Sequence, residues 1–167
     1  AARPYFGTMY DTVRDIATNT RGVRNVFLKQ REVKNKCYIV VAGDRGLAGG
    51  YNSNIMKLVL SHMGDKKEKV MPIGKKANEF FAKRGYDILK SAESVEKCGY
   101  EETLAFAQEA MDLYKKGEVD EVYMVYTEFV SPLTQRPKLL KVLPLAFDKE
   151  ENKETKEQSA KGTRVQY

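Results

Sequence analysis

The segment CYIVVAGDRGLAGGYNSN, residues 37–54, contains the strongest indication of the fold class. It opens with an uninterrupted apolar run, residues 37–42, which is too short for a helix and typical of a parallel strand covered on both faces. A glycine-rich turn, residues 43–50, follows the run. A strand that ends in a glycine-rich turn before a helix predicts the first unit of an open α/β sheet.

The helix after this turn has predictable ends. Asn52 or Ser53 is expected as the N-cap, because short polar side chains there accept hydrogen bonds from free helix N–H groups. The helix is expected to run through Met63 and to end at Gly64, a residue that tolerates the left-handed conformation of a helix terminus.

Outward from this unit, strands and helices continue to alternate. Residues 101–116 give the clearest helix, with an apolar stripe and basic residues in the last turn. The other predicted elements are strands at 70–73, 86–89 and 122–126, a helix at 75–84 and an outer strand at 138–147. This order predicts an α/β fold: an open, mostly parallel, Rossmann-like sheet flanked by helices.

The two ends of the chain differ from this centre. Apolar residues at Tyr5, Met9, Val13 and Ile16 have helical spacing and resemble the tail of a helix whose beginning is absent, so we expect a piece of a longer chain. Residues 148–164 hold five acidic and five basic side chains and almost no apolar ones, which predicts a loop or tail. The predicted segments are residues 1–20, a central domain at 21–147 and a charged loop at 148–167.

The composition limits the classes of function. A length of 167 residues suits one domain, and no apolar run approaches the roughly 20 residues that span a bilayer. The net charge of +6 and the pI near 9.2 permit an anionic partner. The basic residues are scattered, however, and no basic stripe interleaved with aromatic residues is present. A nucleic-acid-binding domain is therefore indicated by charge alone.

The chain is also poor in metal ligands and catalytic pairs. Its two cysteines, Cys37 and Cys98, are far apart, and His62 is the single histidine, whereas a structural zinc site takes about four such ligands. Each cysteine is expected to be a small buried or half-buried thiol. His62 is expected to be a surface residue near the end of a helix. We therefore predict no metal, cofactor or catalytic residue.

The glycine-rich turn occupies the position where open α/β sheets bind phosphates. Its spacing fits neither fingerprint: Ala48 stands at the second glycine of a P-loop, and Gly43 and Gly46 are too far apart for G-x-G-x-x-G. A carboxylate at Asp44 would also repel phosphate. The alternative is structural, with the glycines permitting positive φ angles. The turn-forming residues are then Gly43, Gly46, Gly49, Gly50 and Asn52. Arg45 remains as an exposed cation able to bind a carboxylate in bidentate fashion.

Residues 43–54 resemble the hallmark turn of the gamma subunits of F-type ATP synthases. Ala48 departs from a cysteine that is frequent in this motif. Further blocks are similar to the family and follow in its order: 31–34, 73–76, 80–81, 84–86, 125–129, 131–137 and 143–145. Together these blocks cover most of residues 1–147.

The resemblance implies a mechanical role and no catalysis. It implies a central-stalk rotor subunit that couples ion-driven rotation of a membrane ring to ATP synthesis or hydrolysis in the catalytic head. The implied partners are the alpha and beta subunits of the head, the epsilon subunit and the ring of c subunits, with no nucleic acid and with the membrane reached only through the ring. Residues 1–20 would be the stub of a coiled-coil shaft helix. The form of the turn at 51–54 resembles bacterial members, which implies the cytoplasmic face of the plasma membrane.

The resemblance also implies roles for residues of the turn. Arg45 is expected to contact a carboxylate of the catalytic beta subunit. Asp44 is expected to orient Arg45 or to cap the turn. Leu47 is expected to supply an apolar contact to the same partner, with burial in the chain's own core as the alternative.

Two other functions stay open. An α/β enzyme that binds a nucleotide or phosphosugar through the turn at 43–50 predicts saturable nucleotide binding. A basic nucleic-acid-binding domain predicts binding to DNA or RNA that falls steeply with salt. For a rotor subunit we expect neither nucleotide binding nor nucleic-acid binding.

Overall fold

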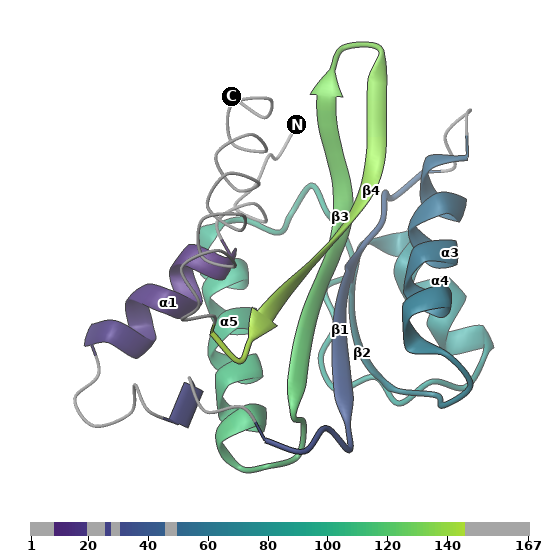
Figure 1. The fold of residues 1–167 in the computed structure, drawn as a ribbon. Helices are drawn as coiled ribbons and strands as arrows, with labels where there is room; N and C mark the ends of the chain where they lie inside the picture. Colours follow the sequence, from purple (N-terminus) through teal and green to yellow (C-terminus); the bar gives the residue numbers. More distant parts are fainter. Residues whose placement is uncertain (1–8, 20–25, 28–30, 46–49, 146–167) are drawn as a thin grey trace.

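A four-stranded sheet with helices on both faces organises the chain in the computed structural model, which describes residues 9–19, 26–27, 31–45 and 50–145 (Figure 1). The strand order is β2-β1-β3-β4. β1 runs parallel to both β2 and β3, whereas β3 and β4 are antiparallel. The strands are β1 (Lys36–Val41), β2 (Lys69–Ile73), β3 (Glu121–Ser131) and β4 (Thr134–Leu143). The predicted open α/β sheet, parallel in three of its four strands, is confirmed.

The apolar run of β1 is buried on both faces because this strand lies inside the sheet. Successive side chains of a strand point to opposite faces. Tyr38 and Val40 accordingly join one hydrophobic cluster, while Cys37 and Ile39 join the other. All four are fully buried. An unbroken apolar run, rather than an alternating one, is what such a two-sided position requires.

Helices α3 (Tyr51–Met63) and α4 (Lys75–Lys83) cover one face of the sheet (Figure 1). Ile55 and Val59 of α3 are fully buried and lie four positions apart, as do Ala77 and Phe81 of α4. This spacing places each pair on one side of its helix. The apolar side of each helix therefore meets the sheet.

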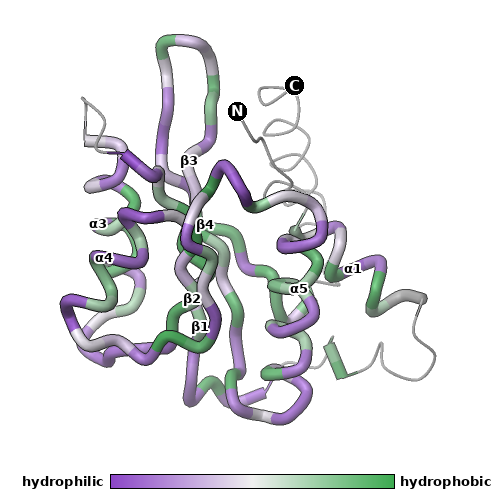
Figure 2. Tube along the Cα trace, turned by 180° about the vertical axis from the view of Figure 1, so that it is seen from behind, coloured by the Kyte–Doolittle hydropathy of each residue, from purple (hydrophilic) through white to green (hydrophobic). Residues whose placement is uncertain are grey.

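The opposite face is covered by α5 (Tyr100–Lys115), on which α1 (Met9–Asn19) packs. Met9, Val13 and Ala17 of α1 are fully buried in the same cluster as the inner residues of α5. Seen from behind, hydrophobic and hydrophilic residues alternate along α5, as expected for a helix with one buried side (Figure 2). The described part of the N-terminal helix is thus joined to the body of the domain.

Most predicted elements are confirmed, with ends displaced by a few residues. The segment at 86–89 is an exception, since it forms no regular strand. Ile88 makes an isolated parallel bridge with Val70 of β2, and Ala92, farther along the chain, makes a second one with Ile73. The Leu89 N–H still donates to Val70 O at 3.0 Å. This segment lies beyond β2 at the sheet edge, where only one neighbour holds its register.

The outer strand was also predicted too late in the chain. β4 begins at Thr134, not 138, and ends at Leu143, and β3 extends to Ser131. The two strands form a hairpin that rises beyond the rest of the sheet (Figure 1). Polar pairs such as Glu128 opposite Arg136 extend the ladder, and cross-strand pairs of opposite charge stabilise antiparallel strands. Apolar runs alone do not predict strands in which many residues are polar.

Several expectations fall outside this description. The charged loop at 148–167, Tyr5 and the first part of the N-terminal helix lie outside the described residues. Within the described ranges, every helix is too short or too polar to cross a bilayer.

Candidate functional site

The carboxyl ends of β1 and β2 meet at the start of the glycine-rich turn. The Ala42 N–H donates to Ile73 O at 3.0 Å, and the Lys76 N–H donates to Gly43 O at 3.1 Å. The beginning of the turn is thereby held against the first residues of α4. This is the edge of the sheet at which α/β folds carry their functional groups.

Gly74 makes this close approach possible. Its φ is +103°, and a Cβ atom there would lie 1.8 Å from Ala42 O and 2.7 Å from a methyl carbon of Val95. No side chain fits in that space, and L-residues rarely adopt that φ. Glycine at 74 is therefore required by both backbone conformation and packing.

Asp44 joins three segments through its carboxylate. One oxygen accepts hydrogen bonds from the backbone N–H groups of Lys75, at 3.2 Å, and Val95, at 3.0 Å. The other accepts from the Ser94 hydroxyl at 2.7 Å. Partial burial alone would raise the pKa of this carboxyl, but these hydrogen bonds outweigh it and hold the pKa below its ordinary value. Asp44 therefore fixes the base of the turn to the helix α4 and to the segment before α5.

The Asn52 side chain, from the first turn of α3, holds the beginning of the glycine-rich turn by two hydrogen bonds. Its side-chain carbonyl accepts from the Gly43 N–H at 2.9 Å, and its amide group donates to Arg45 O at 3.0 Å. The predicted N-cap role of Asn52 or Ser53 is wrong. Gly50, in the left-handed conformation at φ +70°, is the N-cap of α3, and no side chain caps it. The Asn52 side chain turns back to the loop, so the helix begins earlier than predicted.

The glycines of the turn differ in their conformations. Gly50 has the positive φ that was expected, but Gly43 does not, so the expectation is wrong at that position. A Cβ atom on Gly43 would meet its nearest neighbour, the Asn52 carbonyl oxygen, at an ordinary 3.5 Å. The predicted turn residues Gly46 and Gly49 lie outside the described residues, as does Leu47, the predicted apolar contact.

Arg45 is exposed beside this fixed framework. Its backbone carbonyl is held by Asn52, and its neighbour Asp44 is held by three donors. Gly43, Asp44 and Arg45 are consecutive, and the Asn52 side chain joins the first and the last of them across the turn. The arrangement offers a cation from a firmly anchored backbone, which suits contact with a carboxylate.

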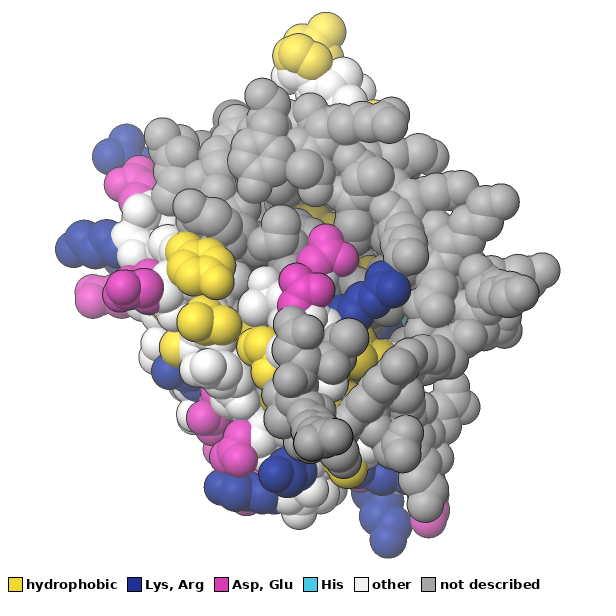
Figure 3. All heavy atoms as spheres, turned by 90° about the vertical axis from the view of Figure 1, so that its left-hand side faces the viewer, with side chains coloured by type: hydrophobic (Ala, Val, Ile, Leu, Met, Phe, Trp, Pro, Cys, Tyr) yellow, Lys and Arg dark blue, Asp and Glu magenta, His cyan; other side chains and the backbone are white. Residues whose placement is uncertain are grey.

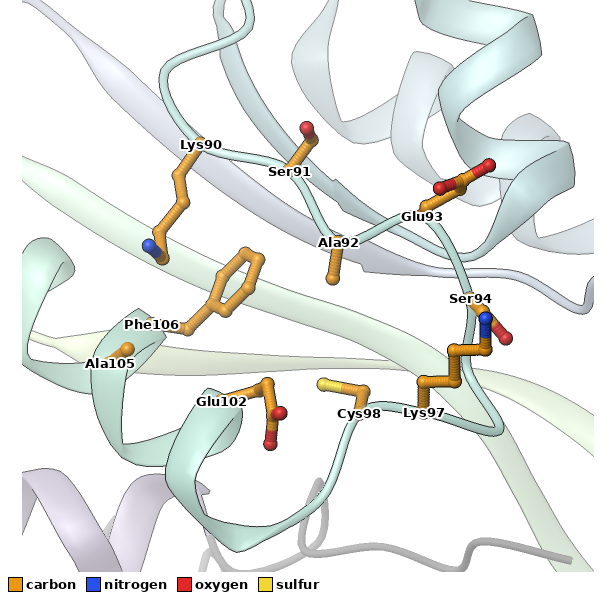
Figure 4. Close-up of a pocket in the computed structure, with 10 residues that line it drawn as sticks. All are labelled: Lys90, Ser91, Ala92, Glu93, Ser94, Lys97, Cys98, Glu102, Ala105 and Phe106. Carbon is orange, nitrogen blue, oxygen red and sulfur yellow. The ribbon is translucent and has the colours of Figure 1, made fainter.

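A pocket of about 280 Å³ lies next to this framework, between the segment 90–98 and the first turns of α5 (Figure 4). Ser94 belongs to both, because it lines the pocket and donates to Asp44. No local sequence pattern predicts this pocket, because its walls come from separate segments. Within the part of the chain that is described, no three His, Cys, Asp or Glu side chains gather as metal ligands would.

Both cysteines are buried, as predicted. Burial raises the pKa of the Cys37 thiol to about 12 and raises the pKa of Cys98 as well. A thiol in the protonated form is a poor nucleophile. Neither cysteine therefore has the character of a reactive residue.

His62 lies in the last turn of α3 and is exposed, as expected, yet it has defined partners. Its Nδ1 is 2.7 Å from the Tyr38 hydroxyl, and its ring centroid is 4.5 Å from that of Tyr123. These neighbours bury one part of the ring, and this partial burial is the main cause that lowers its pKa; the nearby Lys36 acts in the same direction. This contact joins α3 to the sheet and was not predictable from local sequence.

Charges on the described surface are mixed in sign. On the side that carries α1 and α5, acidic and basic side chains are interspersed wherever described residues are visible (Figure 3). Several basic residues are paired, including Lys116 with Asp112 at 2.9 Å. This distribution agrees with the scattered charge inferred from the sequence.

Comparison with known proteins adds to this geometry. The family model described as ATP synthase matches residues 1–166. The ATP synthase gamma chain of Alkaliphilus metalliredigens is 43% identical over 145 residues, covering 86% of this chain and 50% of that relative. The sodium ion specific ATP synthase gamma chain of Acetobacterium woodii is 39% identical over 171 residues, covering 95% and 56%. The chain thus spans about half the length of the curated relatives it matches.

Solved structures show the same fold at low sequence identity. A chain of the Euglena gracilis mitochondrial ATP synthase rotor has a TM-score of 0.51 and 17% identity, covering 90% of this chain and 56% of that one. A chain of the Tetrahymena thermophila mitochondrial ATP synthase central stalk and c-ring has a TM-score of 0.53 and 16% identity, covering 96% and 86%.

Proposed function

Because this chain belongs to the ATP synthase gamma chain family, we propose that it forms the globular part of a central-stalk rotor subunit. In this role it breaks no bond. It transmits the ion-driven rotation of a membrane ring to the catalytic head, where ATP is made or hydrolysed.

The proposed partners are the alpha and beta subunits of the head, the epsilon subunit and the ring of c subunits. Family membership supports a membrane-associated complex, and the chain reaches the membrane only through the ring. The bacterial relatives support a location on the cytoplasmic face of the plasma membrane.

The observation that carries the proposal is the exposed Arg45 on a fixed base. Asp44, the residue before Arg45, is bound to α4, and the Arg45 carbonyl itself accepts a hydrogen bond from Asn52. We assign Arg45 the contact with a carboxylate of the beta subunit. An exposed ion pair contributes only about 0–1 kcal/mol, so such a contact forms and breaks in each turn without arresting the rotor.

Asp44 and Leu47 have different places in this proposal. The carboxylate of Asp44 is occupied within the chain, so we assign it to anchoring the turn rather than to touching the partner. Leu47 lies outside the described residues and is proposed as an apolar contact from the resemblance alone.

The Asp44 carboxylate weakens the case for a nucleotide site. Three donors hold it at the base of the turn, and its hydrogen bonds keep its pKa below the ordinary value. A charged carboxylate in that place repels a phosphate.

The Arg45 contact is tested by reversing the charge at position 45 in the full-length chain, assembled in the complete complex. We expect Arg45→Glu to lower ATP-driven ion transport several-fold, because a carboxylate on the partner would repel it. Lys57→Glu, an equal charge change at an exposed position of α3, is the matched control and should transport ions normally. Equal transport by both variants would refute the contact.

A second test addresses the assignment to the rotor. The chain is titrated by calorimetry with the epsilon subunit of the same organism, and in parallel with ATP and NAD. One-to-one binding of epsilon without nucleotide heat is expected. Nucleotide binding without epsilon binding would instead indicate a ligand site in the turn.

A further inference from the structure

The segments that lead into and out of the sheet meet at the C-terminal end of α5. Phe27 lies in the connector between α1 and β1, and Leu145 follows β4. The Leu145 N–H donates to Phe27 O at 2.7 Å, so the two segments are joined directly. The Phe27 ring lies next to Tyr114 in the last turn of α5, with 6.0 Å between the ring centres. Both segments are therefore held at the same end of one helix.

Arg31 binds the connector to the same end of α5. Its guanidinium donates to the Asp120 carboxylate at 2.9 Å, and one of its terminal nitrogens donates to Tyr114 O at 2.8 Å and to Val119 O at 2.7 Å. Its central carbon lies over the Tyr114 ring, 4.0 Å from the ring centre. A planar guanidinium has its donors in a fixed geometry, and a cation is favourable where the carbonyls of a helix end. Arg31 thus contacts α5 and the loop before β3 at once.

Asp120 holds the connector from the side of β3. Its second oxygen accepts hydrogen bonds from the N–H groups of Lys34 and Asn35, both at 2.9 Å, and its own N–H donates to Asn35 O at 2.7 Å. Partial burial alone would raise the pKa of this carboxyl, but the bonds from Asn35, Lys34 and Arg31 outweigh it and hold the pKa below its ordinary value. The carboxylate is therefore charged at neutral pH, and its ion pair with Arg31 is present there.

This ion pair is better shielded from water than most on the described surface. The Arg31 side chain is 30% exposed and that of Asp120 only 10%. In the pair of Lys116 with Asp112, by contrast, both side chains are more than half exposed. An exposed pair contributes little, whereas removing one partner of a shielded and hydrogen-bonded pair leaves the other without compensation. The Arg31 contact is therefore one whose loss has a measurable effect.

The helix α1 is also held by α5, but through an apolar contact. Met9, Val13 and Ala17 are fully buried in the cluster that contains the inner residues of α5. In Figure 1, α1, α5 and the end of β4 lie side by side. Apolar contact is not directional, so it keeps two helices together without fixing their relative position strongly, whereas hydrogen bonds have preferred distances and angles. The bonds of Arg31 supply this directional constraint where the connector reaches the sheet.

We propose that Arg31 is a positioning residue of the rotor. It fixes the connector after α1 to the end of α5, so that α1 and the segment after β4 turn with the sheet as one body. The proposal rests on the proposed function, because a part that carries torque needs both segments held against a twisting force. When Arg31 is removed, the connector yields as the membrane ring resists rotation.

Hydrogen exchange tests the contact itself, in the full-length chain assembled in the complete complex. Arg31→Gln removes the ion pair with Asp120. We expect the amides of Asn35 and Leu145 to exchange at least about tenfold faster, the change that loss of one charge-assisted hydrogen bond produces. Unchanged exchange at both amides would overturn the assigned contact.

Arg84→Gln is the matched control for this variant. Arg84 also lies over an aromatic ring, 3.7 Å from the centre of Phe80, and also donates to a carbonyl, Phe80 O, at 3.1 Å. Its partner belongs to α4, the helix that Arg84 itself ends, so its contacts join no distant segments. Exchange at Asn35 and Leu145 in Arg84→Gln should equal that of wild type.

ATP-driven ion transport tests the positioning role. Complexes that carry each variant are placed in vesicles, and ATP hydrolysis and ion transport are measured on the same preparation as the ion gradient rises. We expect Arg31→Gln to hydrolyse ATP normally but to transport fewer ions per ATP as the gradient grows, and Arg84→Gln to match wild type. A residue needed only for folding would lower hydrolysis and transport in the same proportion, because less complex assembles. That outcome, or an unchanged ratio, would overturn the proposal.

Arg31→Lys keeps the proposal testable if Arg31→Gln does not assemble. Lysine keeps the positive charge, but its single ammonium does not reproduce the fixed donor geometry that reaches Asp120, Tyr114 O and Val119 O. We expect its ratio of ions transported to ATP hydrolysed to lie between those of Arg31→Gln and wild type, or below wild type where Arg31→Gln gives no complex. A ratio equal to that of wild type would overturn the role assigned to the guanidinium.

The outcomes separate the two proposals. An unchanged ratio for Arg31→Gln, together with one-to-one binding of the epsilon subunit, overturns the positioning role and leaves the rotor function standing. Nucleotide binding without epsilon binding overturns the rotor function, and the positioning role falls with it.

Discussion

The hydroxyl of Ser94 donates a 2.7 Å hydrogen bond to the carboxylate of Asp44, across 50 positions of sequence. The bond joins the glycine-rich turn after β1 to the segment that precedes α5. A force applied to the turn is therefore passed to two helices, because Asp44 also binds the first N–H of α4. A stiff connection of this kind suits the proposed transmission of torque.

Replacing the Asp44 carboxylate should loosen this junction. In Asp44→Asn, the amide group faces donors at Lys75, Val95 and Ser94, and at least one hydrogen bond is lost. We expect the free energy of unfolding to fall by about 1–3 kcal/mol at neutral pH, measured by urea denaturation. Glu93→Gln, at an exposed position, is the control and should change stability little.

The effect of Asp44 should depend on pH with a definite sign. Its pKa in the folded chain lies below the ordinary value of 3.8, so the carboxylate stabilises the fold fully above that value. This stabilisation is lost as the pH falls through the lower folded pKa. Asp44→Asn should therefore show a shallower loss of stability in acid than wild type. An unchanged acid profile would contradict the assigned hydrogen bonds.

Gly74 should not tolerate a side chain. Gly74→Ala would place Cβ 1.8 Å from Ala42 O at a φ of +103°, and we expect a loss of more than about 3 kcal/mol, or no folding at all. Gly64→Ala is the matched control, because Gly64 also has a positive φ, +76°, but open space around it. Its φ of +76° with ψ of −149° is a conformation that L-residues rarely adopt, so Gly64→Ala should lower the free energy of unfolding by about 1–3 kcal/mol through backbone strain alone. Thermal unfolding of both variants measures the difference, and equal losses would refute the steric explanation.

A buried carboxylate in the β3–β4 hairpin should matter more than its exposed partner. The Glu128 side chain is 3% exposed and lies 2.8 Å from Arg136 and 3.0 Å from Lys138, whose side chain is only 11% exposed. Glu128→Gln should cost about 3 kcal/mol, because Lys138 then stays buried without its counter-ion. Arg136→Gln should lower the free energy of unfolding by only about 0–1 kcal/mol, because the Arg136 side chain is 58% exposed. Urea denaturation measures both variants. Equal losses of unfolding free energy would show that burial of the Glu128–Lys138 pair does not contribute.

His62 should make stability depend on pH near neutrality. Its pKa in the folded chain is below the ordinary value of 6.5, so the folded state favours the neutral ring that pairs with Tyr38. The resulting stabilisation is present above pH 6.5 and is lost as the pH falls through the folded pKa. His62→Gln should flatten this part of the stability profile. Since His62 is the single histidine, its NMR titration is unambiguous, and a pKa at or above 6.5 would contradict the prediction.

Periodicity and turn residues were sufficient for most of the fold. The apolar run at 37–42 had to be a strand covered on both faces, and the stripe of 101–116 had to be a helix, because burial of apolar surface dominates both choices. Periodicity and turn residues do not predict the elements whose position is set by strand pairing rather than by burial. The polar residues of the β3–β4 hairpin form a ladder through cross-strand partners, and the segment at 86–89 lacks a second neighbour.

Three features follow from residues that are close together in the chain: the order of the elements, the exposed arginine of the turn and the family resemblance. Three others require the folded chain: the bonds from Asp44 to Ser94 and Val95, the lack of room for a Cβ atom at Gly74, and the pocket beside the turn. These features depend on atoms brought together from distant segments. Local sequence patterns do not predict such contacts, because the partners meet only after the sheet and its helices have packed.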